Sequence, residues 1–130
     1  METITKPQVD VDQELLESAK TSVQEENQVI VHVSVSISFP PLGMRIWPST
    51  FLIPRDGSPQ AKLLHVEGIS KAPQWTIVSG RRYSFTLIFE GLSKDCQVFD
   101  LEEDIPSPSR FQYNGIIRNQ SDVYRLHLRE

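Results

Sequence analysis

Three histidines are the residues best suited to bind a metal ion or transfer a proton, and they stand far apart in the chain, at His32, His65 and His127. Each lies in a different stretch of alternating apolar and polar residues. No H-x-H, H-E-x-x-H or His/Cys spacing would bring two of them onto one ion. We therefore interpret them as surface histidines and predict no metal and no cofactor.

Cys96 is the single cysteine, which excludes an internal disulfide, a C-x-x-C redox pair and a cysteine-rich zinc site. A reactive thiolate needs an electropositive pocket or a helix N-terminus, whereas Cys96 follows Asp95 and has only Lys94 as a basic neighbour. No G-x-S-x-G motif offers a nucleophilic serine. The sequence indicates a neutral or partly buried thiol, and we predict that the protein is not an enzyme.

An acidic run, Asp100-Leu101-Glu102-Glu103-Asp104, could coordinate calcium through its carboxylates. It lacks the spaced Asp, Asn and Gly of an EF-hand loop, so we interpret it as a solvated strand edge that discourages pairing with another sheet. Further along, Asn119-Gln120-Ser121 matches the glycosylation acceptor pattern, which has meaning only on a secretory route.

Two tryptophans and a group of basic residues make up the candidate binding site. Aromatic rings beside arginines can stack on sugars or bases, and this pattern points to Trp47, Trp75, Arg81 and Arg82 as ligand-binding residues. The same patch would include Arg45, Arg55 and Lys62. The alternative is that the tryptophans anchor the core or cap one end of it.

Short strands must position these residues. Apolar side chains alternate with polar ones from Val29 to Phe39 and from Tyr83 to Glu90. Further strand-like runs follow at 45–53, 62–66, 74–78, 97–101, 111–117 and 123–128, separated by turn signals. With no convincing helix between them, the pattern predicts an all-β antiparallel sandwich of about seven or eight short strands. The short connections exclude a parallel βαβ architecture.

The core and the domain boundary follow from the same alternation. One face of the two clearest strands should be buried, with Val31, Val33, Val35, Ile37, Phe85, Leu87 and Phe89 in the core. Residues 1–27 are acidic and rich in Gln, with a thin apolar stripe at Val11, Leu15, Ala19 and Val23. We expect them to form a flexible or weakly helical segment before a β-sandwich domain at 28–130.

Net charge and hydropathy limit the kinds of partner and the cellular compartment that we expect for this protein. Thirteen Lys and Arg against 17 Asp and Glu give a net charge of −4, which disfavours nucleic acid. No apolar run approaches the roughly 20 residues of a membrane-spanning helix, and we expect a monomer. Residues 1–13 do not read as a secretory signal, so the protein is cytoplasmic as the sequence stands, or periplasmic or cell-surface if a signal has been removed.

A family resemblance rests on short motifs between Val33 and Ile117. These are Arg45-Ile46, Ser49-Thr50-Phe51-Leu52, Asp56-Gly57, Gly68-Ile69, Ser79-Gly80, the run 85–92, the run 99–102 and Gly115-Ile116. On these residues the chain resembles a family of uncharacterised bacterial β-sandwich domains, immunoglobulin-like in outline, some of which precede thioredoxin-like modules in exported proteins. The resemblance implies an immunoglobulin-like fold and brings no catalytic residue.

The function expected from the sequence is that of a non-catalytic β-sandwich used for binding or as an accessory module, with a protein or glycan partner. The alternative is a small carbohydrate-binding or hydrolytic domain with a site near Trp47, Trp75 and Arg81/Arg82. A concave pocket joining those residues would favour the alternative.

Overall fold

The structure, a computed structural model, describes residues 27–108 and 110–130. The segment predicted at residues 1–27 therefore lies outside the described residues, except for Asn27. The described residues form nine strands and no helix, which confirms the all-β prediction. This part of the chain accordingly holds no helix that is long and apolar enough to span a bilayer.

Seven of the strands belong to one sheet, in the order β8-β7-β3-β4-β6-β1-β9, and β2 and β5 form a small second sheet. In chain order the strands are β1 (Val29–Ser36), β2 (Leu42–Met44), β3 (Thr50–Pro54), β4 (Ala61–Glu67), β5 (Thr76–Val78), β6 (Arg82–Phe89), β7 (Val98–Glu103), β8 (Gln112–Ile117) and β9 (Val123–Arg129).

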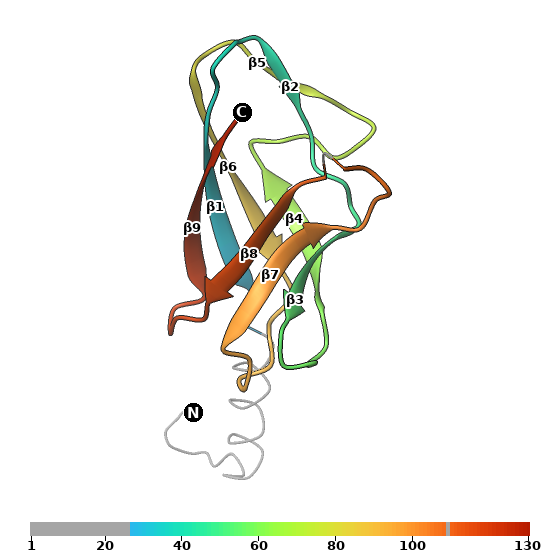
Figure 1. Ribbon diagram of the computed structural model, residues 1–130, viewed down its shortest axis with the longest axis vertical. Helices are drawn as coiled ribbons and strands as arrows, with labels where there is room; N and C mark the ends of the chain where they lie inside the picture. The colour runs from blue at the N-terminus through green and yellow to red at the C-terminus, as the bar shows by residue number, and fades with distance from the viewer. Residues whose placement is uncertain (1–26, 109) are drawn as a thin grey trace, which may run out of the picture.

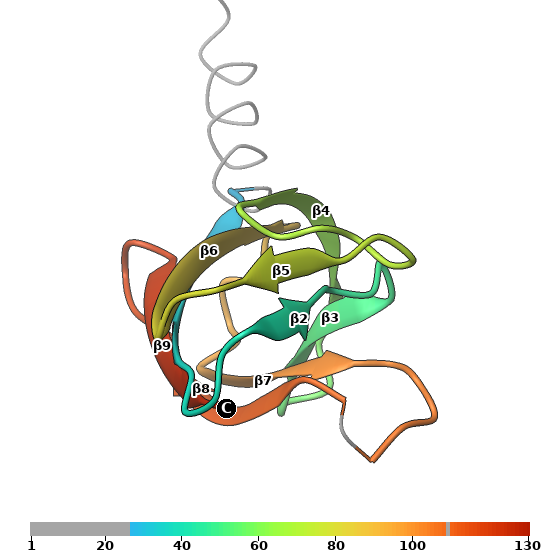
Figure 2. The same cartoon turned by 90° about the horizontal axis from the view of Figure 1, so that it is seen from above.

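The large sheet curls into a half-barrel because its two edge strands are neighbours in the chain. β8 and β9 lie at opposite edges of the sheet, yet only residues 118–122 join them. The sheet must therefore bend until its edges approach one another, as Figures 1 and 2 show. Phe99 of β7 and Tyr124 of β9 meet edge-to-face across the interior, with ring centroids 5.1 Å apart.

Strand direction departs from the prediction at one pair. β9 runs parallel to β1, whereas the other pairs within the sheets are antiparallel. The turn at 118–122 brings the chain to the end of the barrel where β1 begins, and the Ile30 amide donates to the Asp122 carbonyl there. β9 therefore starts beside the start of β1 and follows it, a direction that apolar alternation does not encode.

The core fills the inside of the curl. All seven residues predicted to be buried are at most 5% exposed, which confirms the predicted face of both strands. β1 and β6 pair with Val31 opposite Leu87 and Val33 opposite Phe85, so their apolar side chains share one face. The small β2–β5 sheet lies across one end of the half-barrel (Figure 2).

Candidate functional site

An arginine and the two tryptophans of the chain form a cluster at the end covered by β2 and β5. The Arg45 guanidinium carbon lies 3.9 Å from the ring centroid of Trp75 and 5.0 Å from that of Trp47. These distances are those of cation–π contacts. We call Arg45, Trp47 and Trp75 the aromatic cluster.

The pairing of β2 with β5 positions the cluster. Met44, the last residue of β2, is opposite Thr76, the first residue of β5, so Arg45 and Trp75 lie just beyond this end of the two strands. Gly43 makes room for the ring, because a Cβ there would lie 3.3 Å from a Trp75 ring carbon. Ile46, buried between Arg45 and Trp47, exchanges backbone hydrogen bonds with the loop at residues 70–72.

The cluster is open to solvent. Trp75 is 56% exposed, Trp47 36%, and the neighbouring Ile77 of β5 is 66% exposed. Neither tryptophan belongs to the buried core, so they do not anchor it, but their place at the end covered by β2 and β5 agrees with the alternative that they cap that end. Exposed apolar side chains gathered at one place on a small domain are typical of an interaction surface.

A hollow of about 510 Å³ opens beside the cluster, between the β2–β5 sheet and the half-barrel. All three cluster residues line it, together with the apolar side chains of Leu42, Met44, Ile69, Phe111 and Leu128. Glu103, Arg110, Gln112 and Glu130 line it as well. The hollow therefore has a mixed apolar and polar wall that carries two arginines, two acidic residues and two indole rings.

Glu103 is a buried carboxylate on the wall of this hollow, 4% exposed. Its Oε2 accepts a hydrogen bond from the Trp47 amide at 3.0 Å, and its Oε1 accepts one from the Phe111 amide at 2.7 Å. Both oxygens thus hold backbone segments in place, which satisfies a charge that would be costly to bury alone.

The rest of the acidic run does not form the solvated edge that the sequence predicted. β7 lies inside the sheet between β3 and β8, so its carboxylates have neighbours on both sides. Asp100 accepts from Arg55 at 3.0 Å and from the Gly115 amide at 2.7 Å, and Glu102 pairs with Arg110 at 3.0 Å. Burial acts to raise the pKa of Asp100, but the hydrogen bonds from Arg55 and Gly115 outweigh it and the pKa is lowered.

The other basic residues of the predicted site lie apart from the aromatic cluster. Arg81 donates to the Ser38 carbonyl at 2.9 Å, and Arg82 is opposite Ser36 on the outer face of the sheet. Arg55 pairs with Asp100, and Lys62 lies on β4. None of the four lines the hollow, whereas Arg45, a secondary candidate in the sequence, is central to it.

The histidines have local polar partners. His32 Nδ1 lies 2.8 Å from the Thr86 hydroxyl, His127 Nε2 lies 3.2 Å from the Ser36 hydroxyl, and His65 pairs with Glu67 at 3.6 Å. Among residues 27–108 and 110–130, no three His, Cys, Asp or Glu side chains come close enough together to hold a metal ion.

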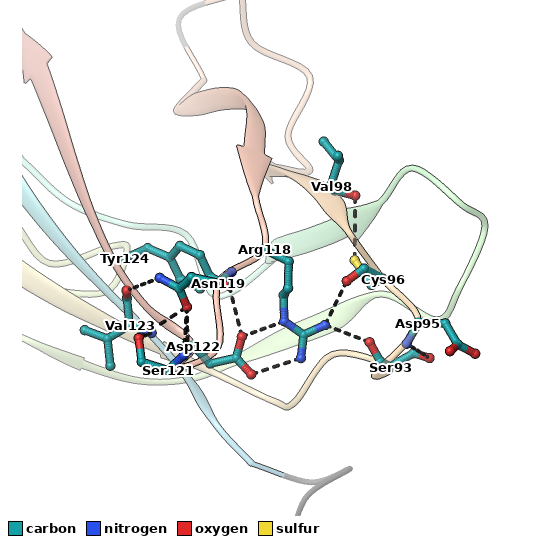
Figure 3. A network of polar contacts seen from close by, with 10 residues as sticks. All are labelled: Ser93, Asp95, Cys96, Val98, Arg118, Asn119, Ser121, Asp122, Val123 and Tyr124. Carbon is teal, nitrogen blue, oxygen red and sulfur yellow. Dashed lines mark hydrogen bonds and ion pairs between the residues drawn. The ribbon is translucent and has the colours of Figure 1, made fainter.

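A second polar network occupies the opposite end of the half-barrel, where β8 turns into β9 (Figures 1 and 3). Arg118 donates from Nε and Nη2 to the two carboxylate oxygens of Asp122, at 2.6 and 2.9 Å. Its Nη1 donates to the backbone carbonyls of Ser93 and Cys96, at 2.7 and 3.1 Å. We call Ser93, Cys96, Arg118, Asn119, Asp122 and Tyr124 the polar latch.

Asn119 and Tyr124 complete the latch. The side-chain oxygen of Asn119, Oδ1, accepts from the backbone amides of Ser121 and Asp122. Its side-chain nitrogen, Nδ2, donates to the Val123 carbonyl at 2.9 Å. The nitrogen that a glycan would modify therefore already holds the turn. The Tyr124 hydroxyl donates to the Asp122 carboxylate and accepts from the backbone amide of Asn119. Burial, with this Asp122 contact, raises the pKa of Tyr124 to about 12.

Cys96 lies inside the latch and is 1% exposed, which confirms the expected buried thiol. Burial raises the pKa of the Cys96 thiol, against the opposing influence of Arg118. A thiol held neutral and shielded from solvent is a poor nucleophile, so this network serves the fold.

Comparison with protein-family models, with curated proteins and with solved structures finds no match to this chain.

Proposed function

We propose that the domain is a non-catalytic binding module that holds a protein partner at the aromatic cluster. The observation that carries this proposal is the contact of Arg45 with the exposed rings of Trp75 and Trp47, beside a hollow with apolar side chains on its wall. Tryptophan and arginine are the residues that most often dominate the binding energy of protein interfaces. An apolar side chain of the partner would enter the hollow, and the indole rings would pack around it.

The unused donors of Arg45 favour an acidic residue beside that apolar side chain. Among residues 27–108 and 110–130, Arg45 makes one hydrogen bond, from Nη1 to the Pro73 carbonyl at 3.2 Å, although a guanidinium carries five N–H donors. A carboxylate of the partner would pair with the free donors in a partly desolvated setting.

A protein ligand suits the hollow better than a sugar. A buried sugar needs a hydrogen-bond partner for each hydroxyl, because an unpaired polar group is costly to desolvate. Two polar side chains of the wall are already engaged, because the Glu103 carboxylate accepts two backbone amides and Arg110 pairs with Glu102. The second candidate, a carbohydrate-binding or hydrolytic domain, draws support from the exposed ring of Trp75, on which a sugar ring could stack.

We also propose that the half-barrel is a variant of the bacterial immunoglobulin-like sandwich that the chain resembles in its short motifs. Its two walls, β6-β1-β9 and β3-β7-β8, enclose one core, and the contact of Phe99 with Tyr124 bridges them. This arrangement supports a sandwich-like origin for the curled sheet.

Selection of peptides from a random displayed library on the full chain tests the proposed function. We expect enriched peptides that carry a large apolar residue next to Asp or Glu. The chain holds only Trp47 and Trp75 as tryptophans, so binding should change its indole fluorescence directly. Trp75→Ala and Arg45→Ala should each weaken binding of a selected peptide by about tenfold or more.

Leu64→Ala is the matched control, because Leu64 is also an exposed apolar side chain, 43% exposed, but lies on β4 away from the cluster. Peptides that bind Trp75→Ala as tightly as the unmodified protein would contradict the proposal. If no peptide is enriched, and the protein instead binds neutral oligosaccharides in a way that Trp75→Ala abolishes, the carbohydrate-binding candidate would replace the proposed protein-binding function.

A further inference from the structure

The outer face of the strands β6, β1 and β9 carries a regular grid of polar side chains away from both ends of the half-barrel. The strand register places one residue from each strand in each row. The three rows are Arg82, Ser36 and Arg129; Ser84, Ser34 and His127; and Thr86, His32 and Arg125. With about 3.3 Å per residue and about 4.8 Å between strands, the grid covers roughly 13 by 10 Å.

The grid holds one sign of charge only. Its nine positions contain three arginines, two histidines and four hydroxyl side chains, with no carboxylate. By contrast, residues 27–130 as a whole hold 11 Lys and Arg against 10 Asp and Glu. The nearest acidic side chain in register is Glu67 of β4, opposite Thr86 at the margin of the grid. Surfaces that serve solubility alone intersperse both signs.

The arginines of the grid are also the ones without internal partners. Of the eight arginines between residues 27 and 130, five have a hydrogen-bond or ion-pair partner: Arg45, Arg55, Arg81, Arg110 and Arg118. Within the described part of the chain, Arg82, Arg125 and Arg129 have none, and all three are exposed. Unpaired guanidinium groups on one face present bidentate donors to an external anion.

We propose that this basic grid binds an acidic polysaccharide, a linear chain bearing carboxylate or sulfate groups. The arginines would pair with the acidic groups, and the hydroxyls of Ser34, Ser36, Ser84 and Thr86 would bond to sugar hydroxyls. A ligand with repeated anions separated by uncharged polar groups matches the alternation of Arg with Ser and Thr in the grid.

Other polyanions match the grid less well. Binding to single-stranded nucleic acid relies on aromatic side chains that stack on bases, and no grid position is aromatic. An anionic membrane is held best by a basic surface with apolar side chains that insert, whereas this grid is polar throughout. The site is also independent of the aromatic cluster, so the proposed protein partner and the polysaccharide could bind together.

Binding of the full chain to immobilised heparin and polygalacturonate at about 150 mM salt tests this proposal, with dextran as the neutral polymer. We expect binding to at least one acidic polysaccharide and none to dextran. The variant Arg82→Ser/Arg125→Ser/Arg129→Ser should weaken it by roughly tenfold or more. Arg125→Gln alone should weaken it less, and this single exposed change keeps the test valid if the triple variant does not fold.

The matched control is Lys62→Ser/Lys71→Ser/Lys94→Ser, which removes the same charge from exposed lysines outside the grid. It should retain binding. Equal losses in the two triple variants would show a net-charge effect and overturn the site. If the protein binds neither heparin nor polygalacturonate, the proposed ligand class is wrong. Tighter binding to an oligonucleotide or to phosphatidylserine vesicles would also overturn it.

Discussion

Each end of the half-barrel is centred on one arginine, and the two arginines differ in how fully they are used. Arg118 makes four hydrogen bonds to Asp122, Ser93 and Cys96, and its side chain is 16% exposed. Arg45 makes one hydrogen bond and otherwise lies against the two exposed indole rings. The same residue type therefore closes the fold at one end, and at the other it is half-buried against exposed aromatic rings with most of its donors unused.

The number of unused donors separates structural from functional polar clusters in this protein. A cluster whose donors and acceptors all have partners has nothing left with which to bind a ligand, and its loss costs stability. A cluster with unused donors beside exposed aromatic rings adds little to stability and is available to a partner. The following substitutions test this distinction, beginning with the largest expected effect on the free energy of unfolding.

Arg118→Met should be the most damaging change, because it leaves the Asp122 carboxylate and two backbone carbonyls without their donor. Removing one partner of a buried ion pair costs about 3 to 5 kcal/mol. Urea unfolding followed by circular dichroism measures the loss. Arg55→Met is the control, since Arg55 is 54% exposed in its pair with Asp100 and should cost about 1 kcal/mol or less. Equal losses would contradict the structural role of the latch.

The raised pKa of the Tyr124 hydroxyl predicts a loss of stability at alkaline pH. The pKa of Tyr124 is raised to about 12 by burial and by Asp122, whereas a tyrosine in an unfolded chain has a pKa near 10. Between these values the unfolded chain releases a proton that the folded protein keeps. The contribution of Tyr124 is therefore complete below about pH 10, and stability falls as the pH rises towards 12.

The variant Tyr124→Phe should remove this part of the alkaline slope in unfolding experiments between about pH 9 and 12, and lower stability by about 1 kcal/mol at neutral pH. Tyr113→Phe, at a half-buried position on β8, should keep the slope. A slope that survives in Tyr124→Phe would show that the hydroxyl is not held as described.

Arg45→Ala and Trp75→Ala should change the free energy of unfolding by about 1 kcal/mol or less each, because Trp75 is 56% exposed and the half-buried Arg45 makes a single hydrogen bond within the described part of the chain. Thermal unfolding of the two variants beside Arg118→Met gives the comparison. A loss above about 3 kcal/mol in either would mean that the aromatic cluster holds the β2–β5 sheet in place and would break the distinction between the ends.

Gly43→Ala should have the smallest effect on stability and a visible effect on Trp75. The added Cβ would lie 3.3 Å from the Trp75 ring, which must shift by a few tenths of an ångström. We expect a change in indole emission and weaker peptide binding, with stability altered by less than about 1 kcal/mol. Gly80→Ala is the control, because a Cβ there would meet only the Arg82 carbonyl at 3.8 Å. Unchanged indole emission in Gly43→Ala would show that the Trp75 ring does not lie against Gly43.

Alternation in the sequence predicted the walls of the half-barrel well, because burial of one strand face is a local property. The valines of β1 and Phe85 and Leu87 of β6 are buried as expected. Strand direction and sheet curvature were not accessible in this way. They depend on where the turn at 118–122 sits in space, and on the length of chain that separates β1 from β9.

The candidate site was predicted in its aromatic half only. Trp47 and Trp75 stood out by residue type, whereas Arg45 was only a secondary member of the basic patch around Arg81 and Arg82. The pairing of Gly43 with Ile77 brings Arg45 next to Trp75, and that contact joins residues 30 apart. Glu103 was grouped with an exposed acidic run, although its position between Leu101 and Ile105 in an alternating strand would have favoured an inward side chain.

Chemical-shift mapping with a library-selected peptide tests most directly whether the two ends have different roles. The backbone and indole signals of the full chain would be followed during titration with the peptide. We predict that shifts concentrate at Gly43, Arg45, Trp47, Trp75 and Ile77, while the Arg118 Nε–H and the Asn119 and Asp122 amides stay unchanged. Shifts centred on the polar latch, with the two indole signals unmoved, would contradict the assignment of binding to the aromatic cluster.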